Sequence, residues 1–565
     1  MSDRLTSFLR ELRRRRVGRV AVAYAITAWV LIQVADVVFP RLGLSESLIT
    51  LLIVVASVGF PIALVLAWFF DVVPDSGSRR IPVWAGAAGA LVLVLVGIGA
   101  TAQIWNRLGG DDVPVRSVAV LPFGNLSEDP EQAHLVAGMQ DALITELAQI
   151  ASIRVVSRTS TQRYRDTAEP LDRVASELGV DAVVEGTVLR LGDRLRIQAQ
   201  LIRPLPRERH LWASSYDLDV RDVLNVHAEI AGDITQAIRA RVTPDEANRL
   251  ADTRTVHPEA YEAYLRGMYF LQQQTPDGYT RGLRHLNDAI ALDPADPNAY
   301  AALALGYSVV GHGIIPDAYD RAKAAAARAL DIDSTTVAAY EALAEIALYH
   351  DWDWAAAERN FRRVLALAPN LPEANAHYAW YLEMRGRTAD ARQSMERARS
   401  LDPLNPLWAA WAGWIALDTD DAAALAAARS GLELDPMHPH ALYVAARAAV
   451  QLGRTEEAMP FVPRLDSIPS FRWAAAHVRV LAGDEATARS IAAELEEEPS
   501  PMNAFGLALT YAQLGEVDRA MQWLEEARRG RFSWMPWIHR PNVFLPLTGD
   551  ARYLEMLRQL NLPVP

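Results

Sequence analysis

Residues 372–403 read PEANAHYAWYLEMRGRTADARQSMERARSLDP, and this stretch decides the fold of most of the chain. Its apolar residues recur every three to four positions in two blocks, which predicts two short antiparallel helices joined by a tight turn at Gly386. Ala379 and Ala391 are small, so the two backbones can approach closely. Pro403 ends the unit because proline cannot continue a helix. One such hairpin cannot bury its apolar face alone, so neighbouring hairpins are required.

The stretch resembles the tetratricopeptide repeat, whose order of large and small residues, then Gly, Ala, a large residue, Ala and Pro, it follows without a gap. Similar hairpins recur about every 34 residues, and we expect about eight over 258–543, then a capping helix over 544–565. The second unit is predicted to carry extra residues around 311–316. Pro460 and Pro463 predict a broken second helix in the sixth unit.

The repeat resemblance implies a superhelix whose first helices line a concave face. Carrying the family's groove positions onto the fourth unit gives a candidate peptide groove of Glu373, Ala376, Trp380, Glu383 and Met384. An alternative is that Trp380 only packs between repeats. The DWDW run at 351–354 is open to two interpretations as well: a peptide or sugar site, or tryptophans that fix a hairpin turn.

The N-terminal part of the sequence predicts a membrane module. Residues 1–19 hold seven arginines and form a basic cytoplasmic segment, and apolar runs at 20–39, 48–70 and 83–104 are each close to the ~20 residues of a membrane span. Positive charge before the first and third runs predicts a cytoplasmic N-terminus. Three spans over 20–105 then place residues 106–565 in the periplasm of a bacterial inner membrane, with lipid as a partner of the spans.

Residues 106–116 form a polar linker, and a compact α/β region is expected over 117–245. A buried strand begins at Ser117, and a hairpin is predicted at the Gly-Asp turn of residues 192–193. The stretches SVAVLPFGNLSEDPEQ, GMQDALITELAQI and ASELGVDAVVEGTVLRLGDRLRIQAQLI resemble the TolB-like amino-terminal domain. That resemblance implies a non-catalytic interaction or ligand-sensing module, in a group of bacterial repeat proteins whose members are often mislabelled as adenylate cyclases.

Composition removes several classes of function. The chain of 565 residues has no cysteine, which excludes disulfides, zinc–thiolate sites and cysteine nucleophiles. Its net charge of −13 argues against nucleic acid as a partner. No nucleotide-binding, nucleophile or metal-ligand motif is found, so we expect no enzyme activity, no cofactor, no metal site and no catalytic residues.

The fold class predicted from the sequence is therefore multidomain: three transmembrane helices, a small α/β TolB-like domain and an all-α tetratricopeptide-repeat superhelix. The predicted function is a membrane-anchored scaffold that binds protein or peptide partners outside the cytoplasm. The alternative is a sensor component of a signalling system. The 19 residues before the first span are too few for a cyclase or DNA-binding fold, so such an output domain would be on a partner chain.

Overall fold

The computed structural model describes residues 21–22, 24–30, 32–34, 56, 60, 114–127, 133–165, 167–251, 257–311, 317–540 and 543–564. The chain divides into two compact units, Met1–Asp112 and Val113–Pro565, and each is described by itself.

The structure corrects the predicted fold class, which included a module of three transmembrane spans. It also corrects the cellular location that was predicted from those spans. Within the described residues, no helix has both the length and the apolar character needed to cross a membrane. Most of 20–39, 48–70 and 83–104, including Asp36, lies outside the described residues. The predictions of a transmembrane protein of the inner membrane with a periplasmic 106–565, and of lipid as a partner, are therefore not retained.

The second unit begins with a small mixed sheet, ordered β3-β1-β4-β5-β6 with β2 beside β4. Its strands and helices are β1 (Ser117–Val120), β2 (Gly124–Asn125), α5 (Ala133–Ala148), β3 (Arg154–Val156), α6 (Arg158–Gln162), α7 (Leu171–Leu178), β4 (Ala182–Leu191), β5 (Arg194–Arg203), β6 (Arg209–Asp219), α8 (Val223–Ala237) and α9 (Pro244–Ala251).

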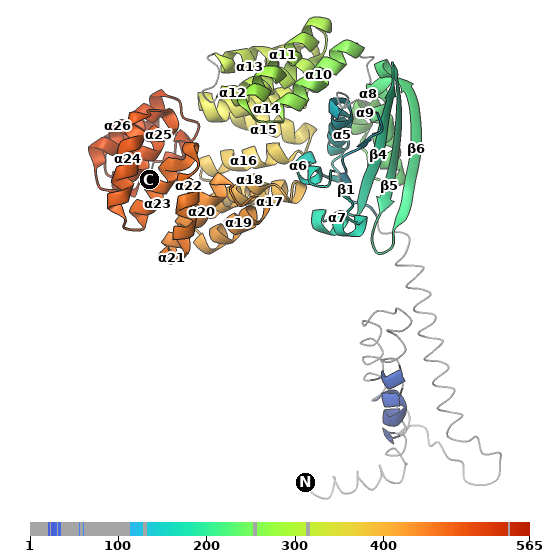
Figure 1. Ribbon diagram of the computed structural model, residues 1–565, viewed down its shortest axis with the longest axis horizontal. Coiled ribbons are helices and arrows are strands. Elements are labelled where there is room, and N and C mark those ends of the chain that lie inside the picture. The colour runs from blue at the N-terminus through green and yellow to red at the C-terminus, as the bar shows by residue number, and fades with distance from the viewer. Residues whose placement is uncertain are drawn as a thin grey trace, which may run out of the picture. The chain divides into compact units, whose positions relative to one another are not determined.

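β1 pairs in parallel with β3 and β4, and β4, β5 and β6 pair antiparallel. The predicted hairpin at residues 192–193 is confirmed, and Gly192 takes the left-handed backbone (φ 63°) that such a turn requires. Alternate residues of β1 point to opposite faces: Val118 and Val120 pack with α5 and α8, whereas Ala119 packs with α7. The parallel part of the sheet is thus covered on both faces (Figure 1).

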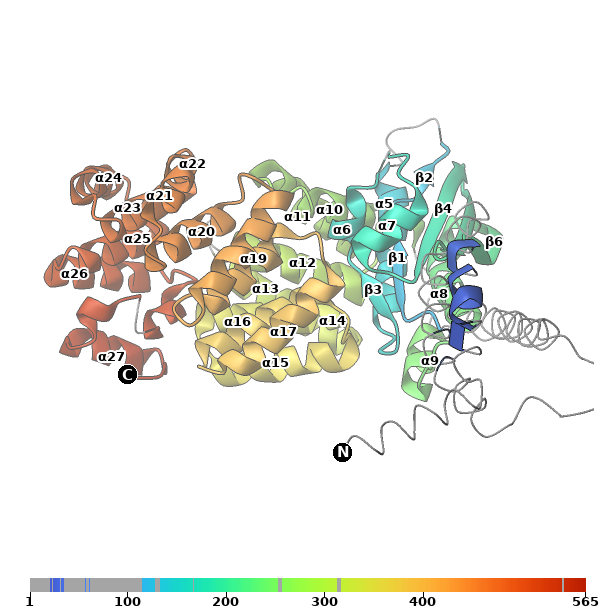
Figure 2. The same ribbon diagram turned by 90° about the horizontal axis from the view of Figure 1, so that it is seen from below.

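From residue 257 the described chain forms eight helical hairpins, stacked in sequence order (Figure 2). They are α10 (Pro258–Leu271) with α11 (Pro276–Leu292), α12 (Pro297–Val310) with α13 (Ala318–Ile332), α14 (Val337–Ile346) with α15 (Trp354–Leu367), α16 (Pro372–Met384) with α17 (Thr388–Leu401), α18 (Pro406–Ala416) with α19 (Asp421–Leu434), α20 (Pro439–Gln451) with α21 (Thr455–Ala458) and α22 (Val462–Asp466), α23 (Arg472–Leu481) with α24 (Glu485–Glu497), and α25 (Pro501–Gln513) with α26 (Val517–Arg529).

The physical reasons for the hairpin are visible in the fourth unit. Pro372 starts α16, where its missing N–H costs no hydrogen bond. Gly386 turns the chain with φ 72°, and Ala379 and Ala391 are fully buried where the helices meet. The sixth unit has the predicted broken second helix, because Pro460 and Pro463 divide it into α21, a 3-10 turn and α22. The extra residues predicted for the second unit fall largely at 312–316, outside the described residues.

The C-terminal part differs from the predicted capping helix. α27 covers only Ala551–Gln559, and 3-10 turns at Met535–His539 and Leu545–Leu547 precede it. This part packs into the largest apolar core of the described chain, which runs from Ala344 to Leu562.

Candidate functional site: the inner face of the repeats

A short non-helical segment returns from the end of α26 across the first helices of earlier repeats. Gly530 ends α26, and Arg531 turns the chain with a left-handed backbone (φ 49°). We call residues 531–540, RFSWMPWIHR, the return segment. The surface that it covers is called the inner face, and it consists of Trp380, Glu383, Trp414, Leu417, His440 and Trp473.

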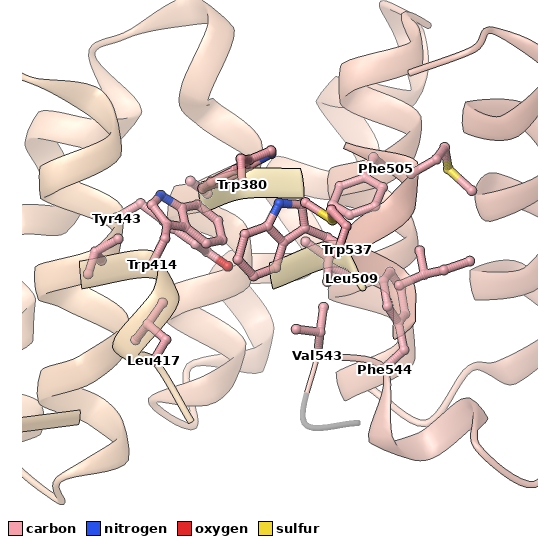
Figure 3. Close-up of a cluster of buried hydrophobic side chains, with 14 of the residues drawn as sticks. Trp380, Trp414, Leu417, Tyr443, Phe505, Leu509, Trp537, Val543 and Phe544 are labelled. Atoms are coloured by element: carbon pink, nitrogen blue, oxygen red, sulfur yellow. The ribbon is translucent and has the colours of Figure 1, made fainter. Parts of the chain in front are cut away.

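Aromatic rings make the centre of this contact. The ring centroid of Trp537 lies 4.7 Å from that of Trp380 and 5.1 Å from that of Trp414 (Figure 3). Trp534 lies 5.4 Å from Trp414 and 5.2 Å from His440. These tilted and edge-to-face arrangements are the favoured ones for aromatic pairs, worth about 0.5–1.5 kcal/mol each beyond their buried area. The two tryptophans of one segment thus contact helices α16, α18 and α20.

A buried ion pair holds the end of the segment. Arg540 Nη1 lies 3.3 Å from Glu383 Oε1, and the two side chains are 7% and 4% exposed. Arg540 also donates hydrogen bonds to the carbonyl oxygens of Trp414 (3.0 Å) and Leu417 (2.6 Å), which the end of α18 leaves unpaired. Burial raises the pKa of Glu383, and the Arg540 guanidinium acts in the opposite direction. A charged arginine is therefore part of what this face recognises.

Further contacts tie the third and fourth units to the C-terminal part of the chain. Arg531 Nη1 donates to the His350 carbonyl at 2.9 Å, and Arg385 Nη1 donates to the Asn561 carbonyl at 2.7 Å. Trp354 Nε1 donates to the Leu560 carbonyl at 2.9 Å. Trp354 is buried, and Asp353 accepts a bond from Ala356 N at the start of α15. In the DWDW run, Trp354 thus packs within the chain, which favours the hairpin-turn interpretation.

Of the predicted groove residues, Trp380 and Glu383 contact the return segment, whereas Glu373 lies at the start of α16, where the charges of Asp402 and Asp141 act on it. Ala376, Trp380, Glu383 and Met384 are buried, and Glu373 is half-buried. Trp380 packs both between repeats, 4.6 Å from Trp411, and against the return segment. The pKa of Glu373 is raised to about 7, first by burial and then by the charge of Asp402.

Several buried polar atoms at this contact have no hydrogen-bond partner. They are the indole nitrogens of Trp380, Trp414 and Trp537. Leaving a buried donor or acceptor unpaired costs about 1–3 kcal/mol. The return segment therefore complements the inner face in shape and charge, but it leaves hydrogen-bonding groups of the contact unpaired.

The α/β region is fixed to the same repeats by a polar junction. Asn370 Nδ2 donates to the carbonyls of Ile150 (3.0 Å) and Ile153 (2.6 Å). Ser160 Oγ donates to Asp402 Oδ1 at 2.6 Å and accepts from Leu404 N at 2.9 Å. Ser160 and its neighbours at the sheet edge therefore have structural contacts, which agrees with the absence of a catalytic motif around them.

Histidines of the inner repeats are held neutral rather than arranged as metal ligands. Burial lowers the pKa of His477 to about 3, and its Nδ1 lies 2.8 Å from the Tyr443 hydroxyl. Among the residues that the structure describes, no group of three or more His, Asp or Glu side chains is placed to hold a metal ion.

The repeat pattern of the sequence does not predict the return segment. Its signal is a run of ten residues with two tryptophans, a proline and two arginines that breaks the repeat period after α26. Trp534, Trp537 and Arg540 are spaced three apart, so they share one side of a 3-10 turn.

These features define the class of the protein: a stack of helical hairpins of the tetratricopeptide type, with a small mixed-sheet domain attached. Among families, the second domain of HilA/YgeH-like transcriptional regulators matches residues 115–228. This match lies on the mixed-sheet domain, and no comparison supports the TolB-like resemblance for that region.

Two curated relatives align with part of the chain. The protein named "Putative adenylate cyclase 3" of Rhizobium meliloti is 33% identical over 39% of this chain and 38% of its own length. Transcriptional regulator HilA of Salmonella typhimurium is 23% identical over 51% of each chain. The chain thus spans about half or less of the length of these relatives.

Solved structures share the repeat architecture at low similarity. The type IV pilus biogenesis factor PilW is 22% identical over 37% of this chain and 96% of its own, with a TM-score of 0.32. IFIT1 with Gppp-AAAA is 14% identical over 55% of this chain and 82% of its own, with a TM-score of 0.36. Likeness at this level describes at most the stacking of helical hairpins, which the helix contacts already establish.

Proposed function

We propose that the chain is a non-catalytic scaffold that binds a peptide segment of a protein partner on the first helices of its repeats. Trp380 and Glu383 are the central residues of the proposed site, with Ala376 and Met384 beneath it and Glu373 beside it. The single observation that carries the proposal is the return segment, because one irregular peptide contacts the first helices of several hairpins through aromatic rings and a buried ion pair.

The chemistry of that contact is typical of peptide recognition. Buried aromatic and arginine anchors supply most of the energy of protein interfaces. The chain's net charge of −13 and the carboxylate of Glu383 favour a partner segment that is basic rather than acidic.

Site-specific crosslinking tests this function in the unaltered fold. A photo-reactive amino acid replaces half-buried Leu407 at the start of α18, and in a matched control it replaces Arg399, which is also half-buried, on the second helix α17. We expect a discrete crosslinked protein from position 407, removed by an excess of unlabelled chain. Equal crosslinking from both positions, or none that the unlabelled chain removes, would contradict the proposal.

A second candidate is a component of a signalling system, with a cyclase or DNA-binding output on a partner chain. It is favoured by the family match over 115–228 and by the names of the two relatives. Purified chain should then form no cyclic AMP alone, and the crosslinked partner should be a cyclase or a DNA-binding protein. Cyclic AMP formation by the purified chain would contradict both candidates.

A further inference from the structure

The conformation of the return segment resembles that of a bound peptide more than that of a repeat. Its regular structure is a single 3-10 turn, Met535–His539, while the first helices on which it lies, α16, α18 and α20, are continuous α-helices. Its anchors are Trp534, Trp537 and Arg540, which all point to the inner face. Its backbone bonds are the short-range ones of turns, such as Met535 N to the Phe532 carbonyl and Trp537 N to the Trp534 carbonyl, so the segment depends on the face for its conformation.

The unpaired polar atoms at the contact indicate that another ligand would be accommodated. The indole N–H groups of Trp380 and Trp414 are buried donors without acceptors. They come from two successive first helices and surround Trp537 (Figure 3). The return segment leaves these two donors unsatisfied, so it is exchanged for another ligand at a lower cost than a fully hydrogen-bonded segment would be.

We propose that the return segment is an intramolecular occupant of the inner face, and that a partner peptide of the same chemistry displaces it. The partner presents two aromatic side chains and an arginine three residues apart, in the order of Trp534, Trp537 and Arg540. This inference rests on the proposed function, because it names the partner of that same site. The partner binds only those molecules in which the segment has left the inner face. The fraction of molecules in that open state therefore sets the apparent affinity for the partner.

The hinge for this displacement is at the end of α26. Gly530 and Arg531 form the sharp turn into the segment, and Arg531 has φ 49°. Helices α25 and α26 also contact each other directly, and Ala508, Ala520 and Leu524 are fully buried there, while Phe505 of α25 packs against Phe532 of the segment at 5.2 Å. Release of residues 531–540 therefore leaves the eighth hairpin its own contacts.

The test uses the full chain and a labelled synthetic peptide of residues 531–540. A released variant, Trp537→Ala with Arg540→Ala, is expected to bind the peptide at least about tenfold more tightly than the wild type, whose face is occupied. Adding Glu383→Ala to the released variant is expected to reverse at least about tenfold of that gain. A control peptide with alanine at both tryptophans and at the last arginine is expected not to bind.

Hydrogen exchange on the unaltered chain makes the outcome independent of whether the variants fold. The amides of residues 534–540 are expected to exchange at least about tenfold faster than those of α23 and α25, through opening that leaves the hairpins closed. Addition of the free peptide in excess should speed their exchange further.

Two results would overturn the inference. One is a folded released variant that fails to bind the peptide, or binds it equally well without Glu383. The other is a return segment that exchanges only together with α23 and α25. Both leave the crosslinking from position 407 unaffected, so a failure here is distinguishable from a failure of the proposed function.

Discussion

At the scale of single residues, the buried ion pair of Glu383 and Arg540 fixes the end of the return segment on the inner face. A buried pair of this kind adds little over a well-packed apolar pair, but removing one partner strands the other charge. The consequence is specific: Arg540 determines how the segment is positioned, while the aromatic rings determine how much surface it buries.

Arg540→Ala is expected to lower the free energy of unfolding by about 3–5 kcal/mol, because Glu383 then remains buried without a counter-charge. Glu383→Gln combined with Arg540→Met is expected to recover most of that loss. Urea denaturation measures both. Arg558→Ala, which breaks an exposed pair with Glu555, is the control and should cost less than about 1 kcal/mol. Equal losses for Arg540 and Arg558 would show that the buried pair is not the cause.

His477 gives the chain a defined sensitivity to acid. Burial, with a smaller effect of the Arg447 charge, lowers its pKa to about 3, whereas in the unfolded chain it is about 6.5. The unfolded state therefore binds more protons, and the stabilisation is complete above pH 6.5 and declines as pH falls toward 3. Between pH 7 and pH 5 we expect His477 to account for roughly 2 kcal/mol of lost stability. His477→Gln should flatten the pH dependence of unfolding, and an unchanged slope would contradict this assignment.

At the scale of elements, the backbone conformation of single residues contributes to the stability of helices and turns, and substitutions at two glycines test this contribution. Gly386 has φ 72° in the turn between α16 and α17, with open space where a Cβ would lie, so Gly386→Ala should cost about 1 kcal/mol of backbone strain. Gly232 lies inside α8 with open space as well, so Gly232→Ala should stabilise by about 0.5–1 kcal/mol. Thermal unfolding of the two variants should shift in opposite directions; a shift of the same sign would argue against backbone conformation as the cause.

The sequence predicts contacts within one hairpin better than contacts between distant parts of the chain. Ala379, Ala391 and Gly386 act within one hairpin, and a period of about 34 residues makes their roles visible. The role of Trp380 depends on Trp537, which is far along the chain and in no repeat register. Hydrophobic periodicity reports which side of a helix is buried but not what buries it, so the occupant of the inner face was missed.

The junction between the mixed sheet and the repeats is an element-scale contact that Asn370 controls. Asn370→Ala removes its two hydrogen bonds to the carbonyls of Ile150 and Ile153 and a third that it accepts from Arg397, so we expect a loss of about 2–3 kcal/mol. The loss should appear as faster hydrogen exchange at residues 150–156. Asn503→Ala, whose side chain bonds the Glu498 carbonyl at an exposed helix start, is the control and should cost less than about 1 kcal/mol. Unchanged exchange at residues 150–156 would indicate that the junction is held elsewhere.

At the scale of the second unit, the return segment changes how the repeats cooperate. A stack of repeats unfolds through nearest-neighbour contacts, so distant hairpins are coupled only through those between them. Here Trp537 bridges α16 and α18 from beyond the eighth hairpin, and Trp354 bonds the Leu560 carbonyl. These contacts close a loop across the third to eighth hairpins.

We therefore expect Trp534→Ala with Trp537→Ala to divide one cooperative transition into two. Without the two indole rings, the link of the fifth to eighth hairpins to the third and fourth keeps only neighbour contacts and a few polar bonds, so we expect the two parts to unfold separately, which lowers the denaturant m-value of the main transition. The matched control is Trp523→Ala on α26, a half-buried tryptophan that bonds Glu496 within adjacent hairpins. It should lower stability without dividing the transition, because it removes only a neighbour contact. Calorimetry and urea titration followed by tryptophan fluorescence distinguish the two outcomes. A single transition with an unchanged m-value in the double variant would mean that neighbour contacts alone carry the cooperativity.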